Sequence, residues 1–161
     1  MKVLVLSDTH GKTNLALLAQ LAENTDLILH LGDGYRDGEL LSVIQPTPLI
    51  QITGNTDFPL EVIPEKMINL ESKNIFLTHG HLYGCKQGTD RLVAKAQEIG
   101  AQVVLYGHTH QPEYLIRDGI TLFNPGSARI SLENETPTAG LLFLEGENIE
   151  ATWIDLRKKK S

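Results

Sequence analysis

The stretch KVLVLSDTH at residues 2–10 joins a short apolar run to an aspartate and a histidine. A run rich in Val and Leu is typical of a buried strand, and Asp8 and His10 follow at its carboxyl end. Four further apolar runs end in similar short polar loops. These loops are GD at 32–33, GNTD at 54–57, HGH at 79–81 and GHTH at 107–110. If the strands are largely parallel, their carboxyl ends bring all five loops together at one sheet edge.

Strands and helices alternate in the pattern around these loops. Buried strands are expected at Lys2–Ser7, Leu27–Leu31, Leu49–Thr53, Asn74–Thr78 and Gln102–Tyr106. Helical periodicity separates them at Lys12–Glu23, around Asp37–Ile44 and at Thr89–Ile99. The last third changes to hairpins, with strands expected at Glu113–Arg117, Ile120–Asn124, Ala139–Leu144 and Ile149–Leu156. We therefore predict an α/β fold, a sandwich of mixed β-sheets flanked by helices.

Length and composition fit one globular domain spanning residues 1–161, with 41% hydrophobic and 21% charged residues. The single cysteine, Cys85, precludes an internal disulfide and fits a reducing cytoplasm, so we expect a cytoplasmic protein. No stretch approaches the roughly 18 apolar residues of a membrane span, so no membrane partner is expected. The net charge of −6 disfavours nucleic acid as a partner. A homo-oligomer is compatible with the sequence.

The polar residues of the five loops are of the types that bind metals. The candidates are Asp8, His10, Asp33, Asn55, His79, His108 and His110. Seven ligands exceed the needs of one tetrahedral ion, but they suit two ions about 3.5–4 Å apart that share a carboxylate. Imidazole and carboxylate together suit borderline divalent ions. We expect two divalent ions, with Mn²⁺ first and Zn²⁺, Fe²⁺, Ni²⁺ and Co²⁺ as alternatives.

Three further residues have competing interpretations. A lone histidine at a strand end, such as His30, is more often a hydrogen-bonded core residue than a ligand. His81 is evenly balanced between a support for the ligands and an ordinary loop residue. Cys85 is close to the predicted ligands, and we favour a bystander over a nucleophile.

Taken in order along the chain, these motifs resemble the calcineurin-like metallophosphoesterase superfamily. The matching residues are Asp8-Thr9-His10, Gly32-Asp33, Gly54-Asn55, His79 and Gly107-His108-Thr109-His110. Asn124-Pro125-Gly126-Ser127 is similar to the small YfcE-like phosphodiesterase branch of that family. The resemblance spans Lys2 to about Leu144 and implies a metallophosphoesterase-type sandwich of two mixed β-sheets.

The resemblance also implies roles for the ligands and a reaction. One ion would be held by Asp8, His10, Asp33 and His110, and the other by Asp33, Asn55, His79 and His108. Asp33 would bridge the two ions. A hydroxide between them would attack the phosphorus of a small phosphoester in line, most simply a phosphodiester. The catalytic residues expected on this basis are Asp33, Asn55, His108 and Asp57.

Two positions depart from the family pattern. Thr56 stands where many members carry a histidine thought to protonate the leaving group. Arg36 stands where the family often has an acidic residue, and it is either a contact to substrate phosphate or an exposed loop arginine. Two other functions compete with a phosphodiesterase. One is a protein-binding scaffold, like the retromer subunit of this fold with an incomplete metal site, and the other is a nuclease.

Overall fold

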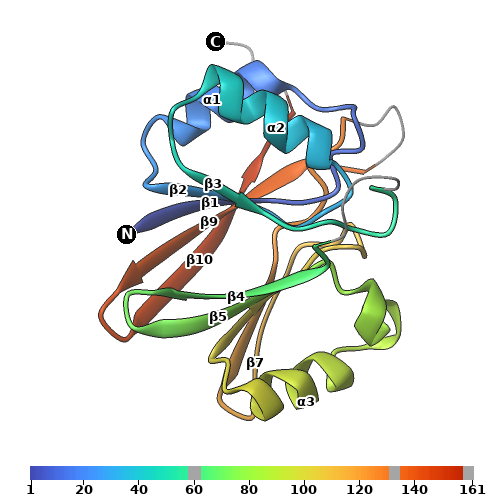
Figure 1. Cartoon of the computed structure of the whole chain (residues 1–161), viewed down its shortest axis with the longest axis vertical. Helices are drawn as coiled ribbons and strands as arrows, with labels where there is room; N and C mark the ends of the chain where they lie inside the picture. The colour runs from blue at the N-terminus through green and yellow to red at the C-terminus, as the bar shows by residue number, and fades with distance from the viewer. Residues whose placement is uncertain (58–62, 131–134, 158–161) are drawn as a thin grey trace.

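Two stacked β-sheets with helices on their outer faces form the described part of the chain, residues 1–57, 63–130 and 135–157, in the computed structural model (Figure 1). The first sheet has the strand order β10-β9-β1-β2-β3. Its strands are β1 (Lys2–Leu6), β2 (Leu27–His30), β3 (Leu49–Gln51), β9 (Thr138–Glu145) and β10 (Asn148–Asp155). β1, β2 and β3 run parallel, whereas β9 and β10 pair antiparallel.

The second sheet is also mixed and has the order β4-β5-β6-β8-β7. Its strands are β4 (Glu65–Leu70), β5 (Lys73–Thr78), β6 (Val103–Leu105), β7 (Glu113–Arg117) and β8 (Ile120–Asn124). β5, β6 and β8 run parallel, and β4 and β7 form antiparallel edges. The predicted sandwich of mixed sheets is thus confirmed. β4 was not expected from the sequence, because its side chains are exposed or half-buried and lack an apolar run.

Three α-helices cover the outer faces of the described sheets (Figure 1). They are α1 (Leu15–Ala22), α2 (Tyr35–Ile44) and α3 (Asp90–Ile99), and the 3₁₀ helices η1 (His81–Tyr83) and η2 (Cys85–Gln87) precede α3. α1 starts three residues later than its periodicity predicts, because the side chain of Asn14 accepts the N–H of Leu17 and caps the helix. α3 ends at Gly100, which has the left-handed conformation typical of a helix stop.

The apolar core lies in three layers. Val5, Leu29 and Leu77 are among the fully buried side chains between the two sheets. A second cluster packs α1 and α2 on the first sheet, and a third packs α3 on the second sheet. None of the helices in the described ranges has the length and apolar character needed to cross a bilayer. The layers hold the carboxyl ends of β1, β2, β3, β5 and β6 in fixed positions, and the predicted ligands follow these ends.

Candidate metal centre

The five polar loops lie together at one end of the two stacked sheets, beyond the carboxyl ends of their strands. Three loops follow β1, β2 and β3 of the first sheet, and two follow β5 and β6 of the second. The expectation of one sheet edge is therefore wrong, because the apolar strands divide between two stacked sheets. Backbone hydrogen bonds link the loops, from Asp8 N to Gly32 O at 3.0 Å and from Gly107 N to His79 O at 3.0 Å.

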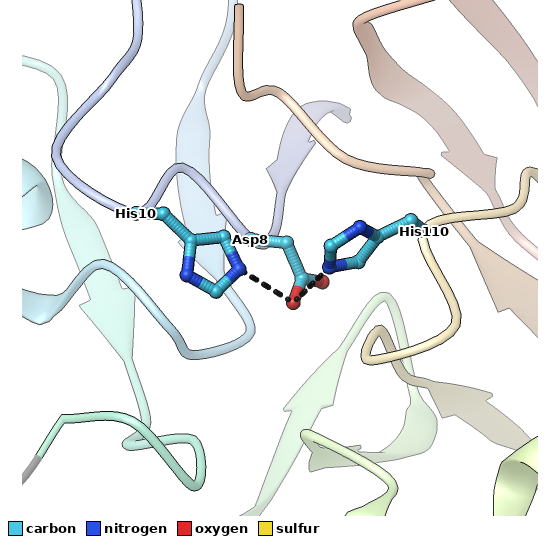
Figure 2. A group of neighbouring side chains, drawn as sticks. All are labelled: Asp8, His10 and His110. Carbon is cyan, nitrogen blue, oxygen red and sulfur yellow. Dashed lines mark ion pairs between the residues drawn. The ribbon is translucent and has the colours of Figure 1, made fainter. Parts of the chain in front are cut away.

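The first group of predicted ligands is Asp8, His10 and His110 (Figure 2). Asp8 Oδ1 lies 3.5 Å from His10 Nε2 and 3.3 Å from His110 Nε2. The Asp8 carboxylate is fully buried, and the two imidazoles are partly exposed. Its second oxygen, Oδ2, accepts hydrogen bonds from the hydroxyl of Ser7 at 2.6 Å and from the backbone N–H of His108 at 3.0 Å. These two bonds leave Oδ1 directed at the imidazoles.

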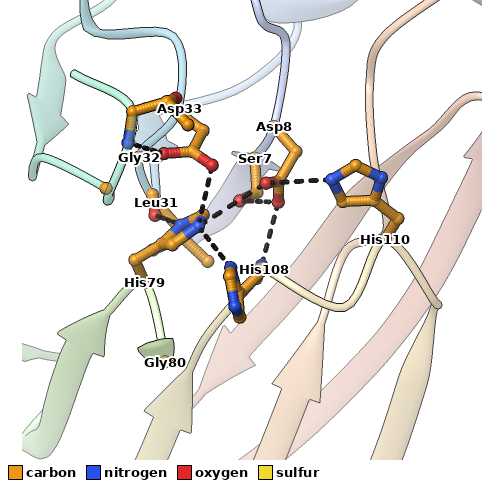
Figure 3. A network of polar contacts seen from close by, with 12 residues as sticks. Ser7, Asp8, Leu31, Gly32, Asp33, His79, Gly80, His108 and His110 are labelled. Atoms are coloured by element: carbon orange, nitrogen blue, oxygen red, sulfur yellow. Dashed lines mark hydrogen bonds and ion pairs between the residues drawn. The ribbon is translucent and has the colours of Figure 1, made fainter. Parts of the chain in front are cut away.

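The second group is Asp33, His79 and His108 (Figure 3). His79 Nε2 lies 3.1 Å from Asp33 Oδ2 and 3.2 Å from His108 Nδ1. His79 Nδ1 is 2.8 Å from the carbonyl oxygen of Leu31, which can only accept a hydrogen bond. Nδ1 therefore carries a proton, and Nε2 is the nitrogen that faces the group.

The two groups adjoin each other. Asp8 Oδ1 lies 3.6 Å from His79 Nε2, and Asp33 Oδ2 lies 3.8 Å from His10 Nε2. Each carboxylate thus faces imidazoles of both groups. Six of the seven predicted ligands fall into the two groups of three. The seventh, Asn55, is exposed in the turn before Asp57, and its role as a ligand stays a prediction.

The donor spacing fits shared metal ions. Ligands about 2.0–2.2 Å from one ion lie about 2.8–3.6 Å from each other in tetrahedral or octahedral geometry. The ligand pairs within the groups measured above are 3.1 to 3.5 Å apart. Asp8 Oδ1 and His10 Nε2 are also buried without a hydrogen-bond partner among the described residues. Buried polar atoms of this kind need a partner, and a cation between the donors would supply it.

The charges of the site favour a bound cation. Burial alone would raise the pKa of Asp8, but the neighbouring imidazoles of His10 and His110 outweigh it and hold the pKa below its usual value. Burial is likewise outweighed at Asp33, whose pKa is lowered by His79. Burial lowers the pKa of His79, yet Asp33 and Asp8 outweigh it and the net shift is upward. The ionised carboxylates thus attract positive charge, whether protons on the imidazoles or metal ions.

Backbone strain is concentrated at the predicted ligands. Five of the seven predicted ligands have a positive φ, which costs a non-glycine residue about 1–2 kcal/mol. They are Asp8, His10, Asp33, His108 and His110. Such strain persists where the surrounding structure enforces it, and it is typical of functional sites.

The loops that carry the predicted ligands also pack closely enough to require glycine. A Cβ atom on Gly32 would lie 2.6 Å from the backbone nitrogen of Gly54, too close for any real contact. A Cβ on Gly54 would lie 2.7 Å from the backbone nitrogen of Asp33. The loop that carries Asp33 and the loop that carries Asn55 therefore lie directly against each other.

Asp57 was predicted to be catalytic, and the structure gives its carboxylate a different environment. Oδ2 accepts the backbone N–H groups of Asp33 at 2.8 Å and Gly54 at 2.7 Å. Oδ1 accepts those of Gly34 at 2.9 Å and Tyr35 at 3.0 Å. Asp57 thus joins the two ligand loops and caps α2, which starts two residues earlier than the sequence pattern predicts.

The three residues with competing interpretations are now placed. His30 is buried and neutral, since burial lowers its pKa; it accepts the N–H of Gly32 and contacts the hydroxyl of Thr9, so the core interpretation is confirmed. The ring of His81 lies 5.5 Å from that of His79, and its Nδ1 is buried without a hydrogen-bond partner in the described ranges. Cys85 is buried, and burial raises its pKa to about 11, so it is a poor nucleophile.

Some supporting contacts were not predicted. The backbone N–H of Thr56 donates to Asp33 Oδ1 at 2.9 Å, and the hydroxyl of Ser127 donates to the carbonyl of Asp8 at 2.8 Å. The NPGS motif at 124–127 was a signal for the second contact, although its partner could not be read from the sequence. A backbone donor such as the Thr56 amide leaves no sequence signal, because every residue except proline carries one.

Nearly the whole chain is similar to known proteins. Residues 1–147 match the calcineurin-like phosphoesterase superfamily domain. The chain is 33% identical over 159 residues to the probable metallophosphoesterase YsnB of Bacillus subtilis, covering 96% of this chain and 91% of that protein. It is 32% identical over 168 residues to the phosphodiesterase YfcE of Escherichia coli, covering 88% and 87%. The structure of Vacuolar Protein Sorting 29 from Cryptosporidium parvum shares the fold, with a TM-score of 0.82 at 20% identity over 99% of this chain and 93% of that one.

Proposed function

Because this chain belongs to the calcineurin-like phosphoesterase superfamily and is therefore a metal-dependent phosphoesterase, we propose that it is a phosphodiesterase with two divalent metal ions. One observation carries the dinuclear proposal: two groups of three ligands lie side by side, each with its donor atoms within 4.8 Å of one another. Mn²⁺ is the ion we propose, because carboxylate, imidazole and the amide oxygen of Asn55 together suit it.

The residues that would hold each ion follow from the two groups. Asp8, His10 and His110 would hold one ion, and Asp33, His79 and His108 the other. Asn55 would complete the second set from its exposed turn. Asp33 would be shared, since its Oδ2 faces both His79 and His10. Bound divalent ions lower the pKa of a water nucleophile and neutralise phosphate oxygens.

The chain's own residues orient this centre. The carboxylate of Asp57 accepts the backbone N–H of Asp33, and the backbone N–H of Thr56 donates to the side chain of Asp33. Both the backbone and the side chain of Asp33 are therefore held in place. Leu31 fixes the tautomer of His79, so that Nε2 keeps its lone pair for a cation when the ring is neutral. In the proposed mechanism Asp57 is therefore a positioning residue, whereas Asp33, Asn55 and His108 act at the reacting centre.

The preference for diesters rests on Thr56. This residue is exposed beside Asp33, at the position where a histidine in many family members is thought to protonate the leaving alcohol. A threonine hydroxyl is a poor proton donor near neutral pH. The alcohol must then leave without a proton from this position, which favours diesters and activated esters over simple alkyl monoesters.

A metal-reconstitution experiment tests the proposal. Protein stripped with a chelator is reloaded with Mn²⁺, Zn²⁺, Fe²⁺, Ni²⁺ or Co²⁺ and assayed against a panel of phosphomonoesters and phosphodiesters. We expect no turnover without metal, two ions per chain at saturation, and diesters as the better substrates. Asp33→Asn should lose both metal occupancy and turnover, and Cys85→Ser is the control that should keep both. Turnover by the stripped protein in chelator would contradict the proposal.

The same experiment separates the competing functions. The likeness to Vacuolar Protein Sorting 29 shows the fold alone. Binding of two ions without turnover of any ester would favour a scaffold. Cleavage of DNA, together with DNA binding that weakens steeply with salt, would favour a nuclease.

A further inference from the structure

We propose that a cavity beside the metal ligands is a binding site for a second phosphate on the substrate, and that Arg36 recognises it. The inference rests on the proposed phosphodiesterase function and narrows its substrate class. The substrate would be a small phosphodiester in which one ester group carries another phosphate.

The cavity adjoins both ligand groups. It has a volume of about 350 Å³ and lies between the loop after β1, the start of α2 and the loop after β3. His10 of the first group and Asp33 of the second both line it, together with Tyr35, Arg36 and Thr56. An ester whose phosphorus lies at the ligands can therefore extend one of its two alcohol groups into this cavity.

Three aspartates line the cavity, and each of their carboxylates already has hydrogen-bond or ion-pair partners within the protein. Asp57 accepts four backbone N–H groups, and Asp37 Oδ2 accepts the N–H of Gly11 at 2.8 Å. Asp33 accepts the N–H of Thr56 and faces His79. Each carboxylate thus already has partners of its own, and Arg36 is the one lysine or arginine among the described residues that line the cavity.

Arg36 is the basic side chain of the cavity that could bind a phosphate. Its side chain is exposed and forms no ion pair within the described ranges, although all three aspartates line the same cavity. Arg36 is also the second residue of α2, where the positive end of the helix dipole disfavours a cation. Helix stability thus gives no reason for an arginine here. A guanidinium with free N–H donors matches a phosphate group in bidentate geometry.

Tyr35 indicates which chemical group of the substrate lies between the phosphodiester and the second phosphate. Tyr35 is half-buried and lines the cavity next to Arg36. An aromatic ring beside a cation suits an alcohol group with an apolar or planar part between two phosphates. A nucleotide that is linked through a phosphodiester and carries a terminal phosphate has these parts, with its sugar and base between the two phosphates. Nucleotides of this kind are therefore the probes for the test.

Binding to the metal-loaded protein tests the site without turnover. Calorimetry compares thymidine 3′,5′-bisphosphate with thymidine 3′-monophosphate, which lacks the second phosphate. We expect the bisphosphate to bind about tenfold more tightly, as one charge-assisted contact allows. Arg36→Gln should bring the two affinities together, and Arg36→Lys should keep part of the difference. Arg91→Gln is the matched control, because Arg91 is the exposed second residue of α3 and does not line the cavity.

Turnover gives a second measurement. The kcat/KM of the dithymidine phosphodiester with a 5′-phosphate is compared with that of the same diester without it, and the ratio should fall to about one in Arg36→Gln. Equal affinities for the two thymidine phosphates in the wild type, or an unchanged difference in Arg36→Gln, would overturn the inference. Failure of the proposed function looks different: neither diester is hydrolysed, while the binding difference still decides whether Arg36 recognises phosphate.

Discussion

Asp57→Asn should be strongly destabilising, although it changes one oxygen to an NH₂ group of the same size. The carboxylate accepts four backbone N–H groups, two on each oxygen, at 2.7 to 3.0 Å. An amide has one oxygen, so its NH₂ group must face two of these donors. A buried donor left without an acceptor costs about 1–3 kcal/mol, and two of them cost about 2–6 kcal/mol. Most domains are stable by about 5–15 kcal/mol, so the variant should still fold.

Chemical denaturation followed by circular dichroism measures this loss. Asp26→Asn is the matched control, because Asp26 accepts a single backbone N–H, that of Lys2 at 2.8 Å, at an exposed position. We expect that control to lose less than about 1 kcal/mol.

A second measurement separates positioning from stability alone. In the folded Asp57→Asn variant the loop that carries Asp33 is held less firmly. We therefore expect the variant to bind closer to one ion per chain at a metal concentration that just saturates the wild type. Equilibrium dialysis with elemental analysis gives this number. The reasoning is refuted if Asp57→Asn is as stable as Asp26→Asn, or if it is destabilised but binds both ions as tightly as the wild type.

Three more predictions concern pH, substrate and a turn. Burial is outweighed by acidic neighbours at His79, and Asp8 raises the pKa of His110, so protonated imidazoles stabilise the metal-free fold and this stability is lost as pH rises through the raised values. The Tm of metal-free protein should therefore fall as pH rises above about 6.5, the ordinary pKa of histidine, whereas the gain in Tm on metal binding should grow; the same change of Tm with pH with and without metal in scanning fluorimetry would argue against these assignments. Thr56→His should raise turnover of alkyl monoesters more than that of aryl diesters, and an equal rise in steady-state assays would remove Thr56 as the cause of the preference. Glu71 and Ser72 have φ values of 49° and 65° in the turn between β4 and β5, so replacing them with Asn-Gly should raise the free energy of unfolding by about 1–2 kcal/mol; no gain in denaturant midpoint would contradict a strained turn.

The candidate ligands could be predicted because their signals are local. An apolar run that ends in a glycine and a metal-binding side chain is readable within about ten residues, as in the segment from Leu27 to Asp33. The helices and the hairpin at Asp118-Gly119 are also local patterns, and they are confirmed. β4 could not be read in this way, since an edge strand with few buried side chains lacks the apolar pattern.

Only the tertiary structure decided which of these residues meet. The backbone N–H of His108 reaches Asp8 across 100 positions of sequence, and such a contact depends on how two sheets stack. The loops come from both sheets for the same reason, and the ligands therefore divide into two groups. The sequence shows that Asp57 and Arg36 are charged residues near the predicted ligands. The kind of side chain alone does not determine which partner each one contacts. The fold directs the Asp57 carboxylate to four backbone amides and leaves Arg36 without an ion pair in the described ranges, because packing decides which donors each charged group can reach.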